Sequence, residues 1–177
     1  QPRVVAGALV FQRPPSGVYG DHYADCLDLH PKQPGDPPRI CFFGESAAAG
    51  YLLAPHITPA KTLQSHLCHL VGNAAPEVTD LARTNERLAT LVETVRASFQ
   101  LSPDLLVIYA GNNWNLLETP ELSPYYPSPE GKQRLAEALR SGGIEALAEL
   151  GLSERLGRAW VALSEIADLA RGRGVPV

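Results

Sequence analysis

Residues 39–50 read Arg-Ile-Cys-Phe-Phe-Gly-Glu-Ser-Ala-Ala-Ala-Gly, and the fold can be predicted outward from this stretch. Its first half is a short, mostly apolar run that Gly44 ends, which is typical of a strand buried on both faces in a parallel sheet. Residues 104–109 form a second such run before Gly111, and residues 77–79 form a shorter one. These three runs are the predicted strands.

Helical patterns separate the predicted strands. Thr58 and Pro59 are a typical N-cap and first-turn pair, and they predict a helix over 60–71 that Gly72 ends. From Glu86 onward, apolar residues recur at helical spacing and predict a second helix with one buried face: Leu88, Leu91, Val92, Val95 and Phe99. This alternation predicts an α/β fold with a doubly wound parallel sheet.

The last third of the sequence begins with a predicted loop over 114–131, which contains four prolines. Two or three helices are expected after it, and the last is predicted to bury one apolar side: Leu156, Trp160, Leu163, Ala167 and Ala170. The sequence has no methionine, and residues 172–177 resemble a helix stop followed by the start of a buried strand. We therefore expect the sheet to be incomplete at the C-terminus and the chain to be part of a longer protein.

Composition narrows the class of protein. The chain has 177 residues, of which 45% are apolar, so it can bury one core. This core is expected in a domain over 39–177. Residues 1–38, which are rich in Pro and Gly, are expected to form an extended lead-in that packs on this domain. A net charge of −4 without a Lys/Arg stripe excludes nucleic acid as an expected partner. No apolar run reaches the length of about 20 residues that a membrane span needs.

The cysteines indicate the compartment. There are three, Cys26, Cys41 and Cys68, and no C-x-x-C pair, which argues against a disulfide framework or a zinc site. No secretory signal peptide opens the sequence. A cytoplasmic location is therefore expected.

Polar residues that can do chemistry follow two of the predicted strands. Ser46 follows one and precedes three alanines, which leave room for a substrate carbonyl, and Asn113 follows another. Ligands of open parallel sheets bind beyond the carboxyl ends of the strands, so a hydroxyl and a carboxamide there can face one pocket. Taken separately, Ser46 also suits a helix N-cap, and residues 111–113 suit a turn. Their occurrence together favours a catalytic pair.

Two stretches resemble blocks of the SGNH/GDSL hydrolases. Residues 43–46, Phe-Gly-Glu-Ser, are similar to the first block, with Glu45 where the family has Asp, and residues 107–113, Val-Ile-Tyr-Ala-Gly-Asn-Asn, are similar to the third. Residues 78–85 fall where the second block would lie, and Asn85 falls at or near the position of that block's glycine. The resemblance covers roughly residues 39–177.

The resemblance implies a flavodoxin-like, three-layer α/β/α fold and a serine esterase or acyl hydrolase that forms an acyl-enzyme on Ser46. It implies that the backbone N–H groups of Ser46 and Asn85 and the side chain of Asn113 hold the oxyanion. No cofactor and no metal are implied. The expected partner is a small ester or acyl substrate, free or bound to a carrier, and four further residues are expected to border it: Gly44, Glu45, Gly111 and Asn112.

The catalytic base is the part of the family pattern that the sequence does not supply. The family carries this base in a late Asp-x-x-His block, and no such block occurs near the end of the sequence. All histidines lie in the first 69 residues: His22, His30, His56, His66 and His69. His56, ten residues after Ser46, is the in-chain candidate. We expect the base instead beyond Val177 or on a second chain.

Three alternatives stay open. An acyltransferase would use the same groups, and a binding or scaffold domain would keep the fold without the base. A flavodoxin-like nucleotide-binding module is the third, although the sequence contains neither G-x-G-x-x-G nor G-K-[ST]. The stretch around Ser46 also lacks the second glycine of G-x-S-x-G, which counts against an ordinary α/β-hydrolase. His66 and His69 have no evident third metal ligand nearby.

Overall fold

The computed structural model describes the backbone of residues 2–5 and 8–11, and residues 29–54, 56–113 and 128–177 in full. Its core is a parallel sheet of three strands in the order β4-β3-β5, with β3 (Arg39–Gly44) between β4 (Glu77–Asp80) and β5 (Leu105–Tyr109). Cys41 pairs with Thr79 on one side and with Leu106 on the other. The three runs predicted as strands are therefore confirmed, with boundaries within a residue.

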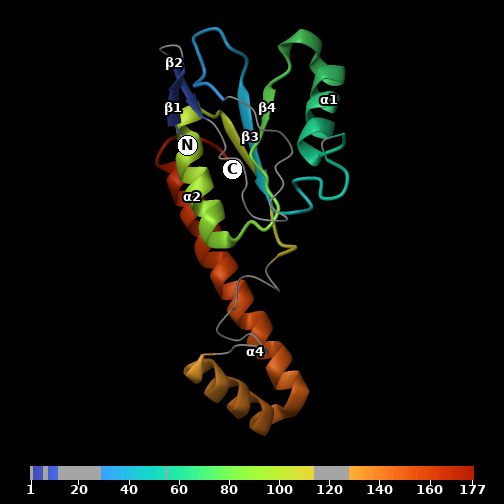
Figure 1. The fold of residues 1–177 in the computed structure, drawn as a ribbon, viewed down its shortest axis with the longest axis vertical. Helices are drawn as coiled ribbons and strands as arrows, with labels where there is room; N and C mark the ends of the chain where they lie inside the picture. The colour runs from blue at the N-terminus through green and yellow to red at the C-terminus, as the bar shows by residue number, and fades with distance from the viewer. Residues whose placement is uncertain (1, 6–7, 12–28, 55, 114–127) are drawn as a thin grey trace.

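Three helices are described alongside the sheet (Figure 1). They are α1 (Pro59–Val71), α2 (Leu88–Ser98) and α4 (Pro129–Arg171), and short 3-10 turns, η1 (Gly72–Ala74) and η2 (Phe99–Leu101), follow the first two. Thr58 caps α1 as predicted, because its side-chain oxygen accepts a hydrogen bond from the Lys61 N–H at 3.1 Å.

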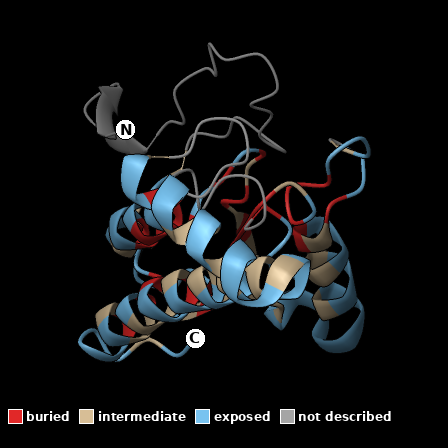
Figure 2. Cartoon of the chain, turned by 90° about the horizontal axis from the view of Figure 1, so that it is seen from below, coloured by how far each residue is buried: buried red, intermediate tan, exposed pale blue. Residues whose placement is uncertain are grey.

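The central strand buries both of its faces. Cys41 and Phe43 belong to a core cluster that includes residues of α2 and α4, and Phe42 belongs to a second cluster with Ala48 and Ala60, on the side of α1. Successive side chains of a strand point to opposite faces, so the sheet lies between two helical layers. Figure 2 shows the buried residues gathered between these layers. The predicted doubly wound, three-layer α/β fold is confirmed.

Arg39 fixes the amino end of the sheet. Its guanidinium donates to the carbonyl oxygens of His30 at 2.6 Å and Leu101 at 2.9 Å, and it forms an ion pair with Glu77 at 2.9 Å. Its backbone N–H donates to Asp104, which also accepts from Lys32, and these hydrogen bonds lower the pKa of the Asp104 carboxyl. The last part of the predicted lead-in is thus tied to the sheet.

Earlier in the lead-in, β1 (Pro2–Val5) and β2 (Ala8–Phe11) pair as an antiparallel hairpin. Residues 12–28, which contain Cys26 and His22, lie outside the described residues. The thiols of Cys41 and Cys68 are free, and burial raises the pKa of the Cys41 thiol to about 12. No helix in the described part of the chain is long and apolar enough to cross a bilayer.

Helix α4 differs from the prediction in two ways. It begins at Pro129, inside the predicted loop, because Ser128 caps it by accepting from the Gly131 N–H at 2.9 Å; residues 114–127 lie outside the described residues. It also contains a kink at Gly142 and Gly143, the second with a φ of 66°, so two helical segments are joined there. Two segments agree with the expected two or three helices.

The predicted buried side of the last helix is wrong at its first two positions. Leu156 and Trp160 are 54% and 76% exposed. Ala170 is buried as predicted, and the other buried residues each lie one position before a predicted one: Ala159, Ala162 and Ile166. Three of these four are alanines, whose small side chains let α4 approach α2 closely. The amino-terminal part of α4 also extends beyond the sheet (Figure 1).

This corrected packing predicts a contrast between two substitutions in α4. Ile166→Ala should lower the free energy of unfolding by about 2–4 kcal/mol, because it leaves a cavity in a well-packed core. Trp160→Ala should change it by less than about 1 kcal/mol, because the ring is largely exposed. Urea unfolding of both variants measures the difference, and an equal loss for Trp160→Ala would contradict the observed packing.

Candidate functional site

The carboxyl ends of the three parallel strands lie at one edge of the sheet, its lower end as drawn in Figure 1. The chain continues from them into Glu45 and Ser46 after β3, residues 81–87 after β4 and residues 110–113 after β5. Backbone bonds from Leu81 N–H to the Phe42 carbonyl at 2.8 Å and from Arg83 N–H to the Gly44 carbonyl at 3.1 Å extend the pairing past β4. This is the edge where parallel sheets bind ligands.

Glu45 joins two of these strand ends. Its carboxylate oxygen Oε2 accepts hydrogen bonds from the backbone N–H of Gly111 at 2.9 Å and of Asn113 at 2.8 Å. The side chain is 1% exposed, and its other oxygen, Oε1, is buried without a hydrogen-bond partner. Charge-assisted bonds to backbone N–H groups are among the stronger hydrogen bonds in proteins. Glu45 therefore fixes the 111–113 loop relative to β3.

Gly44 makes this close approach of β3 and β5 feasible. A Cβ atom at this position would overlap the carbonyl oxygen of Tyr109 and the methyl group of Ala48. The last register pair of the two strands is Gly44 with Tyr109. Any larger residue would push the ends of β3 and β5 apart.

Ser46 is half-buried and begins a series of turns. The Glu45 carbonyl accepts from the Ala49 N–H at 2.8 Å, and the Ser46 carbonyl accepts from the Tyr51 N–H at 2.9 Å. The next helix starts only at Pro59 and is capped by Thr58. Ser46 is therefore not a helix N-cap, and no helix N-terminus lies directly at this serine.

Asn113 is buried beside the Glu45 carboxylate. Its side-chain Nδ2 donates to the Glu86 carbonyl at 3.1 Å, and its Oδ1 accepts from the Asn112 side chain at 2.9 Å. Gly111 and Asn112 are exposed. An amide nitrogen carries two hydrogens, and the described bond to Glu86 uses one of them.

The segment after β4 holds Asn85 and Glu86. Asn85 is exposed and has a φ of 55°, the left-handed conformation that glycine adopts most readily. The buried Glu86 carboxylate pairs with Arg83 at 2.8 Å and accepts from the Thr90 hydroxyl. Sequence analysis missed Glu86, whose backbone carbonyl accepts a hydrogen bond from Asn113; the two residues are 27 positions apart, so no local spacing signals this contact.

None of the described histidines forms a hydrogen bond with Ser46. His56 is exposed on the loop before α1, and His66 and His69 are exposed on α1 itself. His30 offers its backbone carbonyl to Arg39 at 2.6 Å, at the opposite edge of the sheet. Within the described residues, no three side chains of His, Cys, Asp or Glu gather in a way that could hold a metal ion.

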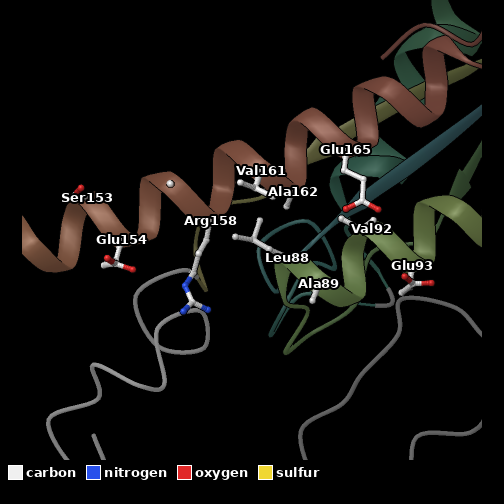
Figure 3. A pocket seen from close by; sticks show the side chains of 11 residues that line it. Leu88, Ala89, Val92, Glu93, Ser153, Glu154, Arg158, Val161, Ala162 and Glu165 are labelled. Carbon is white, nitrogen blue, oxygen red and sulfur yellow. The ribbon is translucent and has the colours of Figure 1, made fainter. Parts of the chain in front are cut away.

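A groove of about 630 Å³ runs between α2 and α4, and Figure 3 shows side chains of both helices lining it. Leu88 and Ala162 lie at its apolar floor, and Glu93, Glu154 and Arg158 add charge. Neither Ser46 nor Asn113 contributes to it. This groove is therefore separate from the strand ends.

Comparisons with known proteins give one distant structural similarity to report. The chain matches no protein-family model and no curated protein. It is similar to a solved structure described as esterase AlinE4, in a serine-to-alanine mutant form, with 22% identity and a TM-score of 0.37. The match covers 62% of this chain and 57% of that chain, so the chain spans a little over half the length of that structure.

The two hydrogen bonds that Glu45 accepts from the 111–113 loop predict that Glu45→Ala destabilises the fold. The free energy of unfolding should fall by about 2–4 kcal/mol, because the substitution removes the shared acceptor of the Gly111 N–H and the buried Asn113 N–H. Hydrogen exchange at the Gly111 and Asn113 amides should also become faster. Urea unfolding and amide exchange measured by NMR test both effects.

Glu165→Ala is the matched control. Glu165 pairs with Arg96 on the surface at 2.6 Å, and an exposed pair of this kind contributes about 0–1 kcal/mol. Unchanged exchange at Gly111 and Asn113 in Glu45→Ala would show that the loop is held by something other than this carboxylate.

Proposed function

We propose that the chain is a serine esterase or acyl hydrolase of the SGNH/GDSL type, in which Ser46 forms the acyl-enzyme. One observation carries the proposal. Glu45, the residue before Ser46, accepts a hydrogen bond from the Asn113 N–H at 2.8 Å. This bond supports the proposal because it holds Asn113 against the residue that precedes Ser46. The similarity of residues 43–46 and 107–113 to two family blocks points the same way.

Three donors are proposed for the oxyanion: the backbone N–H groups of Ser46 and Asn85 and the side-chain Nδ2 of Asn113. The left-handed φ of 55° at Asn85 supports its comparison with a glycine of the family. The exposed Gly111 and Asn112 would border the substrate directly, whereas the buried Gly44 and Glu45 would form the floor beneath it. Donors aimed at developing charge stabilise the transition state more than the ground state.

The proposed reaction has two steps. The Ser46 oxygen attacks the ester carbonyl carbon while its proton passes to a base; the carbon–oxygen bond to the alcohol then breaks, and the alcohol leaves with that proton. Water attacks the acyl carbon and gives a proton to the base. The bond from this carbon to the Ser46 oxygen then breaks, the base returns the proton to that oxygen, and the carboxylic acid leaves. If a second alcohol replaces water, the same groups perform acyl transfer.

A histidine is proposed as the base, and it would come from beyond Val177 or from a second chain. The exposed positions of His56, His66 and His69 favour an outside source over these residues. The exposure of these three histidines also favours a second candidate function, a binding or scaffold domain, because such a domain needs no catalytic base. The exposed free thiol of Cys68 fits a reducing compartment such as the cytoplasm.

Paired substitutions test the proposed function. Ser46→Ala should abolish turnover of p-nitrophenyl acetate without changing the circular dichroism spectrum. Asn113→Ala should lower kcat by about 10²–10³-fold with a smaller change in KM, because a donor to the oxyanion acts mainly in the transition state. Steady-state kinetics of the natural full-length form measure both effects.

Asn73→Ala is the matched control, because Asn73 is exposed in η1, after the carboxyl end of α1. It should behave like the unmodified protein. Normal turnover by Ser46→Ala would remove this serine as the nucleophile, and an effect of Asn113→Ala on KM alone would make Asn113 a substrate-binding residue instead.

A further inference from the structure

We infer that a groove between the Ser46 turn and α1 binds the unbranched acyl chain of the substrate; this inference rests on the proposed function. The groove has a volume of about 650 Å³, and Ala47, the residue next to Ser46, is one of the residues that line it. In an acyl-enzyme the acyl chain stays attached to the serine while the alcohol leaves. A groove lined by the residue next to the serine is therefore suited to the part that stays.

The groove runs lengthwise along α1. Pro59, Thr62, Leu63 and His66 line it, and their spacing of three to four residues places them on one face of the helix. Seven residues of helix span about 10 Å. The groove thus follows α1 over a distance comparable to a medium-length alkyl chain.

The opposite wall consists of large apolar side chains from the loop after Ser46. Tyr51, Leu53 and Ile57 line the groove and are 53%, 58% and 58% exposed. The described lining contains no Asp, Glu, Lys or Arg, and His66 is its ionisable group besides the Tyr51 hydroxyl. An alkyl chain would cover this apolar surface, and removing such surface from water is favourable.

The loop wall is held in place by backbone contacts. Gly50 has a φ of +68°, and a Cβ atom there would lie 2.6 Å from the Ile57 carbonyl oxygen. The Gly50 carbonyl also accepts from the N–H groups of Leu53 at 2.8 Å and Ala54 at 2.7 Å. The apolar side chains therefore stand on a closed loop, which reduces the cost of ordering them when a chain binds.

The test fills the groove with a large side chain. Thr62→Trp places an indole in the groove, and Ser65→Trp places the same group on an exposed position of α1 outside it. Circular dichroism first checks that both variants fold. The full chain is then assayed with p-nitrophenyl acetate, hexanoate and decanoate, which share one leaving group.

In the unmodified protein, kcat/KM should rise by about fourfold for each added methylene until the groove is full. Thr62→Trp should lower kcat/KM for the decanoate ester at least tenfold and leave the acetate ester unaffected, and Ser65→Trp should match the unmodified protein. A rate that follows the length of the alcohol part instead, tested with acetate esters of longer alcohols, overturns the assignment to the acyl chain.

A binding measurement separates this inference from the proposed function. Calorimetric titration of Ser46→Ala with decanoate needs no turnover, and the added Thr62→Trp substitution should weaken the binding at least tenfold. Binding that responds in this way while no ester is hydrolysed would keep the groove and overturn the esterase. Turnover of acetate without any decanoate binding would keep the esterase and overturn the groove.

Discussion

The buried carboxylate of Glu45 is the constraint on which the candidate site depends. It accepts hydrogen bonds from the N–H groups of Gly111 and Asn113 and so joins the end of β3 to the loop that follows β5. A buried carboxylate is costly unless it is bonded, so the sequence can tolerate it only where those two N–H groups are supplied. The next residue is Ser46, whose position relative to Asn113 is therefore set by backbone geometry.

The two edges of the sheet are built differently. At the amino edge, Arg39 binds the His30 and Leu101 carbonyls and the Glu77 carboxylate, which ties β3 to β4 and to the segments beside them. At the carboxyl edge, the Glu45 carboxylate holds the 111–113 loop against the end of β3. Stability and the proposed chemistry thus occupy opposite ends of the same three strands, as is common in parallel α/β folds.

The fold could be predicted where local patterns decide it. The strand β3 and the helix α1 follow from an apolar run and from a Thr58-Pro59 start, and both lie where the sequence indicates. The buried side of α4 could not be found in this way, because the side with Trp160 and the side with the small alanines are both apolar. The alanine side is buried because it allows α4 to approach α2 closely, and the spacing of apolar residues along one helix does not reveal this contact. The bond from Glu45 to Asn113 is also long-range, between residues 68 positions apart.

The proposed function requires that Ser46 is an activated nucleophile beside Asn113. The most direct measurement is covalent labelling of the natural full-length form with a fluorophosphonate, followed by mass spectrometry of its tryptic peptides. Such reagents phosphonylate a serine that a neighbouring base activates and release fluoride. We expect a single adduct on Ser46, lost in Ser46→Ala. An intact protein that forms no adduct, or forms one on another residue, would contradict it.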